Sequence, residues 1–247
     1  MGSAAAAPEY FTAKLKGRRE VAERTLACEF ERPTGFEFKA GQSIDMTLLN
    51  PSETDAEGDK RAFSVASAPH ENTLMFATRL RDTAFKRVLQ SLPLGSEVKI
   101  EGPFGNMTLH NKASRPAVIL AGGIGITPFR SMLLRAAHDK LPHHILLFFS
   151  NRRPEDAPFL AELQRLEGQN PNYRLIATMT EPEKSHQSWK GERGYINQEL
   201  LSRHLKETAS PLYYLAGPPG MVKAMHAMLN AAGVDDDDIR SEEFAGY

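Results

Sequence analysis

The chain has 247 residues, of which 41% are hydrophobic and one, Cys28, is a cysteine. This length and apolar content predict two domains, each with its own core. A formal net charge of −1 gives no support for a nucleic acid bound by bulk electrostatics. The single cysteine excludes an intrachain disulfide and an iron–sulfur cluster held by cysteines of this chain alone.

The cysteine content predicts a reducing, cytoplasmic setting. No apolar run approaches the roughly 20 residues that cross a bilayer, so we expect no membrane span. Residues 1–8 lack the basic start and apolar centre of a signal peptide, and we expect them to be a remnant of expression cloning. The histidines show no metal-ligand spacing, and we predict no metal site.

Short, mostly alternating runs fill the first part of the chain, which is typical of a small antiparallel β-barrel. One helix is expected at 83–91, with Thr83 as its N-cap. The acidic segment 52–60 has no apolar periodicity and is interpreted as a mobile surface loop. The predicted strands are residues 10–15, 21–30, 43–48, 61–67, 73–78 and 97–101.

Two segments of this half could hold an anion. Arg61-Ala62-Phe63-Ser64 combines a fixed charge, an aromatic ring and a hydroxyl, and strand alternation places Arg61 and Phe63 on one face. The segment from Arg79 to Thr83 runs into a helix N-terminus, where the helix dipole stabilises negative charge. Taken alone, the first segment favours a surface arginine, a core phenylalanine and an ordinary serine over a binding site.

After residue 113 strand-like runs alternate with helical stretches, which predicts a parallel sheet with helices on both faces. We therefore place the two domains at 9–113 and 114–247. The predicted strands are 117–121, 144–149, 173–179, 212–216 and 239–244, and the predicted helices are 128–139, 157–168, 197–206 and 220–232.

The first strand and helix of this domain are joined by Gly122-Gly123-Ile124-Gly125-Ile126-Thr127-Pro128. The glycines allow a tight turn, and we expect Thr127 as the N-cap and Pro128 in the first turn of the helix. A helix N-terminus attracts phosphate, so the segment predicts a nucleotide pyrophosphate site. A plain strand-to-helix connection is the alternative.

Ligands of parallel sheets bind at the carboxyl ends of the strands. Ser150, Arg152 and Arg153 follow the second strand, and Gly217-Pro218-Pro219-Gly220-Met221 follows the fourth as another glycine turn into a helix. That helix carries methionines at helical spacing, which we interpret as core packing: Met221, Met225 and Met228.

Five motifs together resemble the ferredoxin–NADP reductase superfamily, and the resemblance runs from about Glu9 to Tyr247. It implies a flavin, FAD rather than FMN, in a six-stranded antiparallel barrel, and NADPH or NADH in the α/β domain. We expect no fused iron–sulfur domain. The motifs are Arg61-Ala62-Phe63-Ser64, Gly102-Pro103-Phe104-Gly105, Gly122 to Pro128, Gly217 to Met221 and Glu242-Glu243-Phe244.

The resemblance also implies roles. Arg61 would neutralise the flavin pyrophosphate, the Phe63 ring, which replaces the family's usual Tyr, would cover the flavin, and Ser64 would lie near flavin N5. Phe244 would stack on the flavin face that nicotinamide must reach, with Tyr247 as its rival. The implied catalytic residues are Ser64, Glu242 and Phe244. The implied cofactor-binding residues are Arg61, Ala62, Phe63, Ser64, Thr78, Arg79, Thr83, Gly122, Gly123, Gly125, Ile126, Thr127, Pro128, Ser150, Arg152, Arg153, Gly217, Pro218, Pro219, Met221, Phe244 and Tyr247.

The implied activity is hydride transfer from NAD(P)H to FAD, followed by electron transfer to a separate acceptor such as a ferredoxin or an oxygenase component. A free-flavin or quinone reductase and a non-catalytic docking subunit are the alternatives. Ser150, Arg152 and Arg153 could pair the 2′-phosphate of NADPH. An arginine there also occurs in relatives that use NADH, so both coenzymes stay open.

Overall fold

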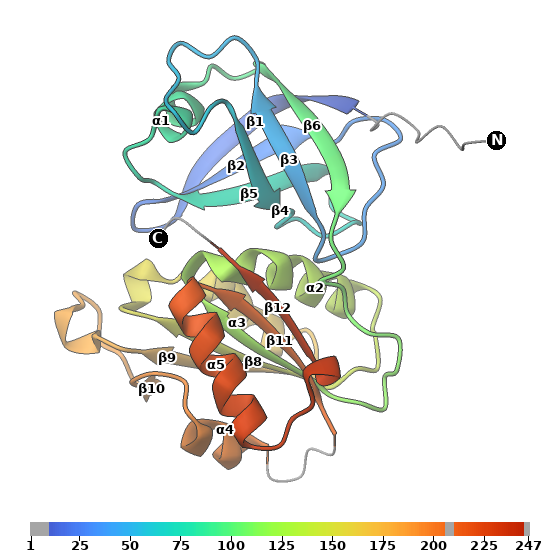
Figure 1. The fold of residues 1–247 in the computed structure, drawn as a ribbon, viewed down its shortest axis with the longest axis vertical. Coiled ribbons are helices and arrows are strands. Elements are labelled where there is room, and N and C mark those ends of the chain that lie inside the picture. The colour runs from blue at the N-terminus through green and yellow to red at the C-terminus, as the bar shows by residue number, and fades with distance from the viewer. Residues whose placement is uncertain (1–9, 206–209, 245–247) are drawn as a thin grey trace.

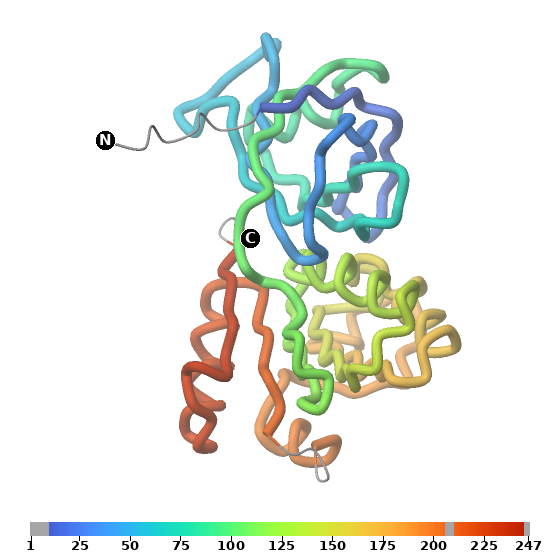
Figure 2. The backbone as a smooth tube through the Cα atoms, turned by 90° about the vertical axis from the view of Figure 1, so that its right-hand side faces the viewer, coloured from blue at the N-terminus to red at the C-terminus, as the bar shows by residue number. Residues whose placement is uncertain are grey.

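The computed structural model describes residues 10–205 and 210–244, which form two lobes stacked along the long axis of the molecule (Figures 1 and 2). The predicted expression remnant and Tyr247 lie outside the described residues. Among those residues, no helix combines the length and the apolar character that a membrane crossing requires.

The first lobe is a six-stranded antiparallel sheet, as the sequence predicts. The structure gives the strand order as β4-β3-β6-β1-β2-β5. The sheet curves so that its edges approach, and Ala66 N, just beyond β4, donates a hydrogen bond to Met75 O of β5 at 2.8 Å. The strands are β1 (Tyr10–Ala22), β2 (Thr25–Glu31), β3 (Ser43–Leu48), β4 (Lys60–Ser64), β5 (Thr73–Arg79) and β6 (Glu97–Phe104).

The first hairpin differs from the prediction. The chain turns between β1 and β2 at Glu23 and Arg24, inside a run predicted as one strand. Arg24 adopts a positive φ of 54°. No glycine or proline marks this turn, so turn chemistry in the sequence does not reveal it.

One helix, α1 (Ala84–Ser91), follows β5, and its cap is as predicted. The Thr83 hydroxyl accepts a hydrogen bond from Lys86 N at 3.4 Å. Phe85, Val88 and Leu89 are buried in the core of the first lobe. The apolar face of α1 therefore fixes its N-terminus beside β4 and β5.

The second lobe is a six-stranded parallel sheet in the order β10-β9-β8-β7-β11-β12. Its strands are β7 (Ala117–Gly122), β8 (Ile145–Asn151), β9 (Tyr173–Met179), β10 (Glu192–Arg193), β11 (Leu212–Gly217) and β12 (Ile239–Glu243). Its α-helices are α2 (Ile126–His138), α3 (Leu160–Glu167), α4 (Gln198–His204) and α5 (Pro219–Ala231), and its short 3-10 helices are η1 (Gly123–Gly125), η2 (Pro154–Asp156), η3 (Pro182–Lys184) and η4 (Asp236–Asp238).

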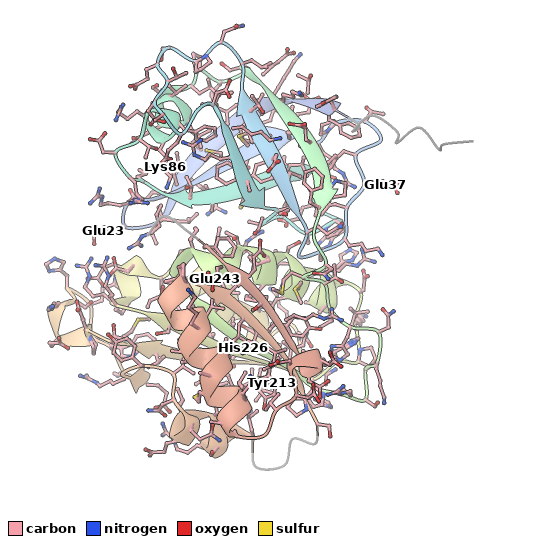
Figure 3. All side chains as sticks on the ribbon, in the orientation of Figure 1. Glu23, Glu37, Lys86, Tyr213, His226 and Glu243 are labelled. Atoms are coloured by element: carbon pink, nitrogen blue, oxygen red, sulfur yellow. The ribbon has the colours of Figure 1, made fainter. Side chains whose placement is uncertain are left out.

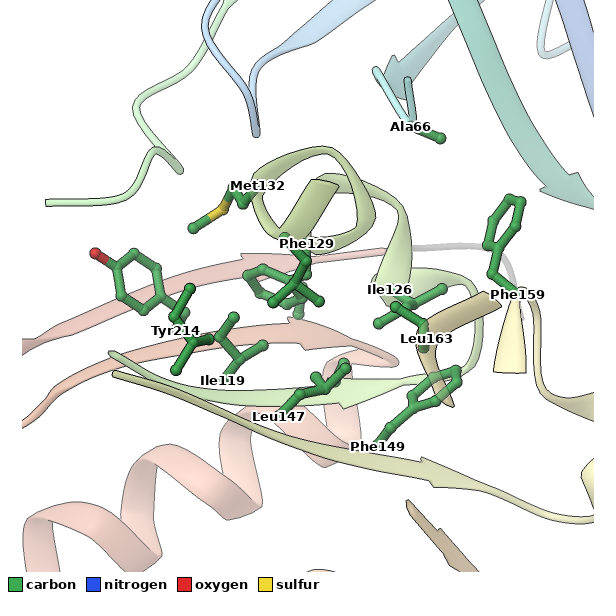
Figure 4. Packing of buried hydrophobic residues seen from close by; sticks show 14 of the residues in the cluster. Ala66, Ile119, Ile126, Phe129, Met132, Leu147, Phe149, Phe159, Leu163 and Tyr214 are labelled. Carbon is green, nitrogen blue, oxygen red and sulfur yellow. The ribbon is translucent and has the colours of Figure 1, made fainter. Parts of the chain in front are cut away.

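Alternating residues of the strands point to opposite faces of the sheet, and each face packs against its own apolar layer. Ile119 packs with Phe129 of α2 on one face, where α3 also contributes to the cluster (Figure 4). Leu120 packs with Met225 of α5 and Leu200 of α4 on the other face. The chain runs outward from β7 through β8 and β9, then returns to β11 on the other side of β7. The strand order reverses at the carboxyl ends of β7 and β11, which is where ligands generally bind on such sheets.

The start of α2 corrects one local prediction. The helix begins at Ile126, one residue before Thr127, and directly follows η1. The Thr127 hydroxyl donates to Ile124 O at 3.0 Å instead of capping the helix. Helical structure therefore begins at Gly123, immediately after β7, and not at residue 128 as predicted. The barrel lies directly above α2 (Figure 1).

Candidate functional site

A cleft of about 420 Å³, here called the first cleft, lies where the two lobes meet. It brings together predicted residues from β4, β5, the α1 cap and the C-terminal segment. Ile124 and Thr127 from the start of the second lobe line its opposite side. The predicted residues that line it are Arg61, Ala62, Phe63, Ser64, Thr78, Arg79, Thr83, Thr127 and Phe244.

β4 presents its side chains as strand alternation predicts. The Arg61 guanidinium lies 5.1 Å from the centre of the Phe85 ring, and the Phe63 ring centre lies 5.9 Å from the same ring. Arg61 and Phe63 therefore share one face, against α1. Phe63 is half-buried, and its ring borders the cleft.

Ser64 provides a direct test of whether a flavin fits here. Its side chain is 5% exposed, and its Oγ has no hydrogen-bond partner among the described residues. A buried hydroxyl without a partner is costly and is rare in folded proteins. Because Ser64 lines the first cleft, a polar ring atom of a bound group would satisfy it.

Positive charge gathers at the other end of the cleft, beside the N-terminus of α1. Arg61, Arg81 and Lys86 line this end (Figure 3 labels Lys86). Burial, together with the nearby charges of Arg81 and Arg61, lowers the pKa of Lys86 to about 8. An anionic ligand would relieve this repulsion, so the donor set fits a diphosphate.

Phe244 reaches the first cleft from the far edge of the second sheet. β12 pairs in parallel with β11, and Phe244 N donates to Gly217 O at 2.9 Å just beyond the last pair. The ring is half-buried against the cleft. Glu242, two residues earlier, does not line the cleft, and burial raises the pKa of its carboxyl group.

A second cleft, of about 770 Å³, opens at the carboxyl ends of β7, β8 and β11. Arg79 lines both clefts, and Gly123 and Ile124 are chain neighbours that line one each. The predicted residues that line the second cleft are Arg79, Gly122, Gly123, Ser150, Arg152, Pro218 and Met221. The described predicted residues that line neither cleft are Gly125, Ile126, Pro128, Arg153, Gly217, Pro219 and Glu242.

Gly125 supports the second cleft through packing. A Cβ atom there would lie 2.4 Å from Ala216 O, which belongs to the backbone of β11 and cannot rotate away. We expect Gly125→Ala to lower the free energy of unfolding by about 1–3 kcal/mol because η1 must move off β11. Urea unfolding measures this change. Gly220→Ala is the control, since its Cβ would meet nothing within 4 Å, and an equal loss in both variants would contradict the packing argument.

The two arginines after β8 are placed differently. Arg153 donates to Asp156 at 2.8 Å and to Glu23 of the first lobe at 2.6 Å, and it lies outside both clefts. Arg152 is 58% exposed and lies 3.5 Å from Asp156. Burial would raise the pKa of Asp156, but the hydrogen bond from Arg153 and nearby arginines hold it below its usual range. The geometry thus leaves Arg152 as the better contact for a ligand.

Several lining residues are not predicted from the sequence. Lys86 belongs to a segment without a motif. Arg81 lies in the predicted anion-binding segment 79–83 but is not among the implied cofactor-binding residues. Tyr195 is 78% exposed beside the second cleft, in a loop that gave no signal. Met225, which we interpreted from the sequence as a core residue, is buried in the core of the second lobe. It also lines the second cleft.

Comparisons with known proteins agree with this arrangement. The family described as "Oxidoreductase NAD-binding domain" matches residues 119–227. Ferredoxin–NADP reductase B of Sorangium cellulosum is 31% identical over 230 residues, covering 89% of this chain and 91% of that protein. The glycine betaine monooxygenase reductase subunit of Chromohalobacter salexigens is 28% identical over 224 residues. The match covers 90% of this chain, which spans 60% of that relative's length.

A solved structure shares the fold. The ferredoxin NADP+ reductase of Neisseria gonorrhoeae, with bound FAD and NADP, superimposes with a TM-score of 0.78 at 22% identity. The superposition covers 95% of this chain and 98% of that chain. The order of the two lobes and the near full-length match to the Sorangium reductase identify the relationship. The chain belongs to the ferredoxin–NADP reductase family.

Proposed function

We propose that the protein is a flavin-dependent NAD(P)H reductase that passes electrons to a separate acceptor. The observation that carries this proposal is that the two clefts meet at Arg79 and at the Gly123–Ile124 step. A flavin in the first cleft and a nicotinamide nucleotide in the second would thus meet at the carboxyl ends of β7 and β11. The Neisseria structure, with FAD and NADP bound on this fold, supports the assignment.

The first cleft would hold FAD. Arg61, Lys86 and the N-terminus of α1 would hold the diphosphate, and the Phe63 ring would cover the isoalloxazine. The Ser64 hydroxyl would donate to the ring near N5, which would satisfy its unpaired oxygen. FAD is favoured over FMN because the Neisseria structure of this fold holds FAD.

The second cleft would hold NADPH or NADH. The N-terminus of the helical segment that begins at η1 would bind the pyrophosphate. Met221 and Pro218 border the cleft at the start of α5, where the nicotinamide would lie. The exposed Tyr195 ring is placed to stack on the adenine.

The chain's own residues contribute alignment and charge to the reaction. When bound, a flavin accepts a hydride at N5 and can release electrons one at a time. Ser64 holds a hydrogen-bond donor at that edge, and Arg79 supplies positive charge between the clefts. The Phe244 ring covers the open side of the first cleft and shields it from water. It must move aside for the nicotinamide to reach the flavin.

The proposal for the electron acceptor is based on the names of two relatives. The Chromohalobacter relative is named as the reductase subunit of a monooxygenase, and the Sorangium relative as a ferredoxin–NADP reductase. We propose a ferredoxin or an oxygenase component as the acceptor of this protein.

Flavin binding and reduction test the proposal. The purified protein, mixed with FAD, should bind it and lose its visible flavin absorption on anaerobic addition of NADPH or NADH. A protein that binds no flavin, or one whose flavin neither coenzyme bleaches, would refute the proposed activity.

Coenzyme selection provides a separate prediction. We expect Arg152→Ala to raise the KM for NADPH about tenfold and to leave the KM for NADH nearly unchanged, because a charge-assisted contact to the 2′-phosphate is lost. Arg153→Ala is the control, since Arg153 is paired with Asp156 and Glu23. Steady-state kinetics with both coenzymes decides it, and equal effects on both would remove Arg152 from the phosphate site.

A further inference from the structure

Residues 53–57 belong to the acidic segment 52–60, which the sequence predicts as a mobile surface loop, and they lie against the first cleft. Asp55 Oδ2 accepts a hydrogen bond from Ala84 N, the first residue of α1, at 2.8 Å. Glu57 Oε2 accepts from the Arg61 guanidinium at 2.8 Å. The groups that would bind a flavin diphosphate therefore already hold carboxylates from this chain.

Further contacts hold the segment 53–57 against Arg61 and α1. The Arg61 guanidinium also donates to Glu57 O at 2.8 Å and to Lys60 O at 2.7 Å, so the chain wraps around it. Asp55 Oδ1 lies 3.8 Å from the same guanidinium. The hydrogen bond from Ala84 N holds the pKa of Asp55 below its usual range, which keeps the carboxylate charged. Glu53 is paired with Arg87 at 2.6 Å, farther along α1.

We propose that Asp55 and Glu57 mimic the flavin diphosphate and set the affinity of the protein for FAD by competing for Arg61 and the α1 N-terminus. This inference rests on the proposed FAD site. Two anions cannot share one guanidinium and one helix N-terminus without repulsion. FAD must therefore displace the segment 53–57, and part of its binding energy is lost in breaking these contacts.

The test compares two double variants in the flavin-free protein. Asp55→Ala with Glu57→Ala removes the mimic. Glu53→Ala with Asp59→Ala removes the same formal charge from the acidic segment 52–60 without touching Arg61 or Ala84. Glu53 is paired with Arg87, and the structure gives the Asp59 side chain no partner among the described residues. Titrations followed by flavin fluorescence give the dissociation constants for FAD and for riboflavin, which has no phosphate.

We expect the Asp55/Glu57 variant to bind FAD about tenfold more tightly than the unaltered protein, because it removes one helix-terminus contact and one ion pair that compete. Riboflavin affinity should be unchanged in it, and the Glu53/Asp59 variant should resemble the unaltered protein. Hydrogen–deuterium exchange of residues 53–58 in the unaltered protein should rise when FAD binds.

Unchanged or weaker FAD binding by the Asp55/Glu57 variant would overturn the inference while leaving the proposed function intact, provided the unaltered protein binds FAD. A gain of similar size for riboflavin would also overturn it, since the effect would then not depend on phosphate. Failure of every form of the protein to bind flavin would overturn both the inference and the proposed function.

Discussion

Replacing Ser64 with alanine should slow reduction of the bound flavin by NAD(P)H about 10- to 100-fold, the loss of one hydrogen bond worth about 1.4–2.8 kcal/mol in the transition state. The hydroxyl is buried in the first cleft, and within the described part of the chain it has no other partner. We therefore propose that its partner is the bound flavin. Anaerobic stopped-flow mixing with saturating coenzyme measures the rate.

Stability separates this role from a structural one. Because the Ser64 hydroxyl forms no bond within the described residues, Ser64→Ala should not lower the melting temperature of the flavin-free protein. Ser64→Thr keeps the hydroxyl and should retain most of the rate. If Ser64→Ala lowered the melting temperature and left the reduction rate unchanged, the proposed contact of Ser64 with the flavin would be wrong.

Replacing Arg130 with methionine should lower the free energy of unfolding by about 3 kcal/mol. Arg130 of α2 is 3% exposed and binds Glu162 through two bonds of 2.7 and 2.8 Å. It also donates to Ala66 O of the first lobe at 2.7 Å and lies 3.2 Å from Glu71. This loss of stability lies at the lower end of the range measured for broken buried ion pairs. The carboxylates of Glu71 and Glu162 are each more than a quarter exposed, so water can solvate them after Arg130 is removed.

Arg135→Met is the matched control on the same helix. Arg135 is exposed and paired only with Asp139 among the ion pairs of the described residues, so its replacement should change the free energy of unfolding by less than about 1 kcal/mol. Urea unfolding of both variants gives the comparison. Equal losses would mean that Arg130 does not join the lobes as the geometry indicates.

Much of this architecture is readable from the sequence because patterning and fold agree. Ser43–Leu48 alternates buried and half-buried positions, and the uniformly buried Ala117–Gly122 reads as a continuous apolar run. The glycine turns at Gly122 and Gly217 are visible because the backbones meet there: a Cβ at Gly217 would lie 3.2 Å from Gly122. Local residue types therefore predict where the second cleft opens, although Gly125, Ile126, Pro128, Gly217 and Pro219 line neither cleft.

The missed features arise from long-range pairing. Asp55 lies 29 residues from Ala84, and its loop shows no periodicity, so its position on α1 cannot be read from local sequence. From the sequence, Arg153 is predicted to contact a phosphate. In the structure it is paired with Glu23, which lies 130 residues away in the chain. Charged side chains reveal their partners only when the fold brings distant segments together.

The central claim is that a flavin in the first cleft and a nicotinamide in the second meet at the ends of β7 and β11. Single-turnover reduction of the FAD-loaded protein by coenzyme deuterated at either face of nicotinamide C4 tests it most directly. The account predicts a primary isotope effect with one of the two labels and none with the other. Flavin that stays oxidised with both coenzymes, or a reduction rate that neither label changes, would contradict it.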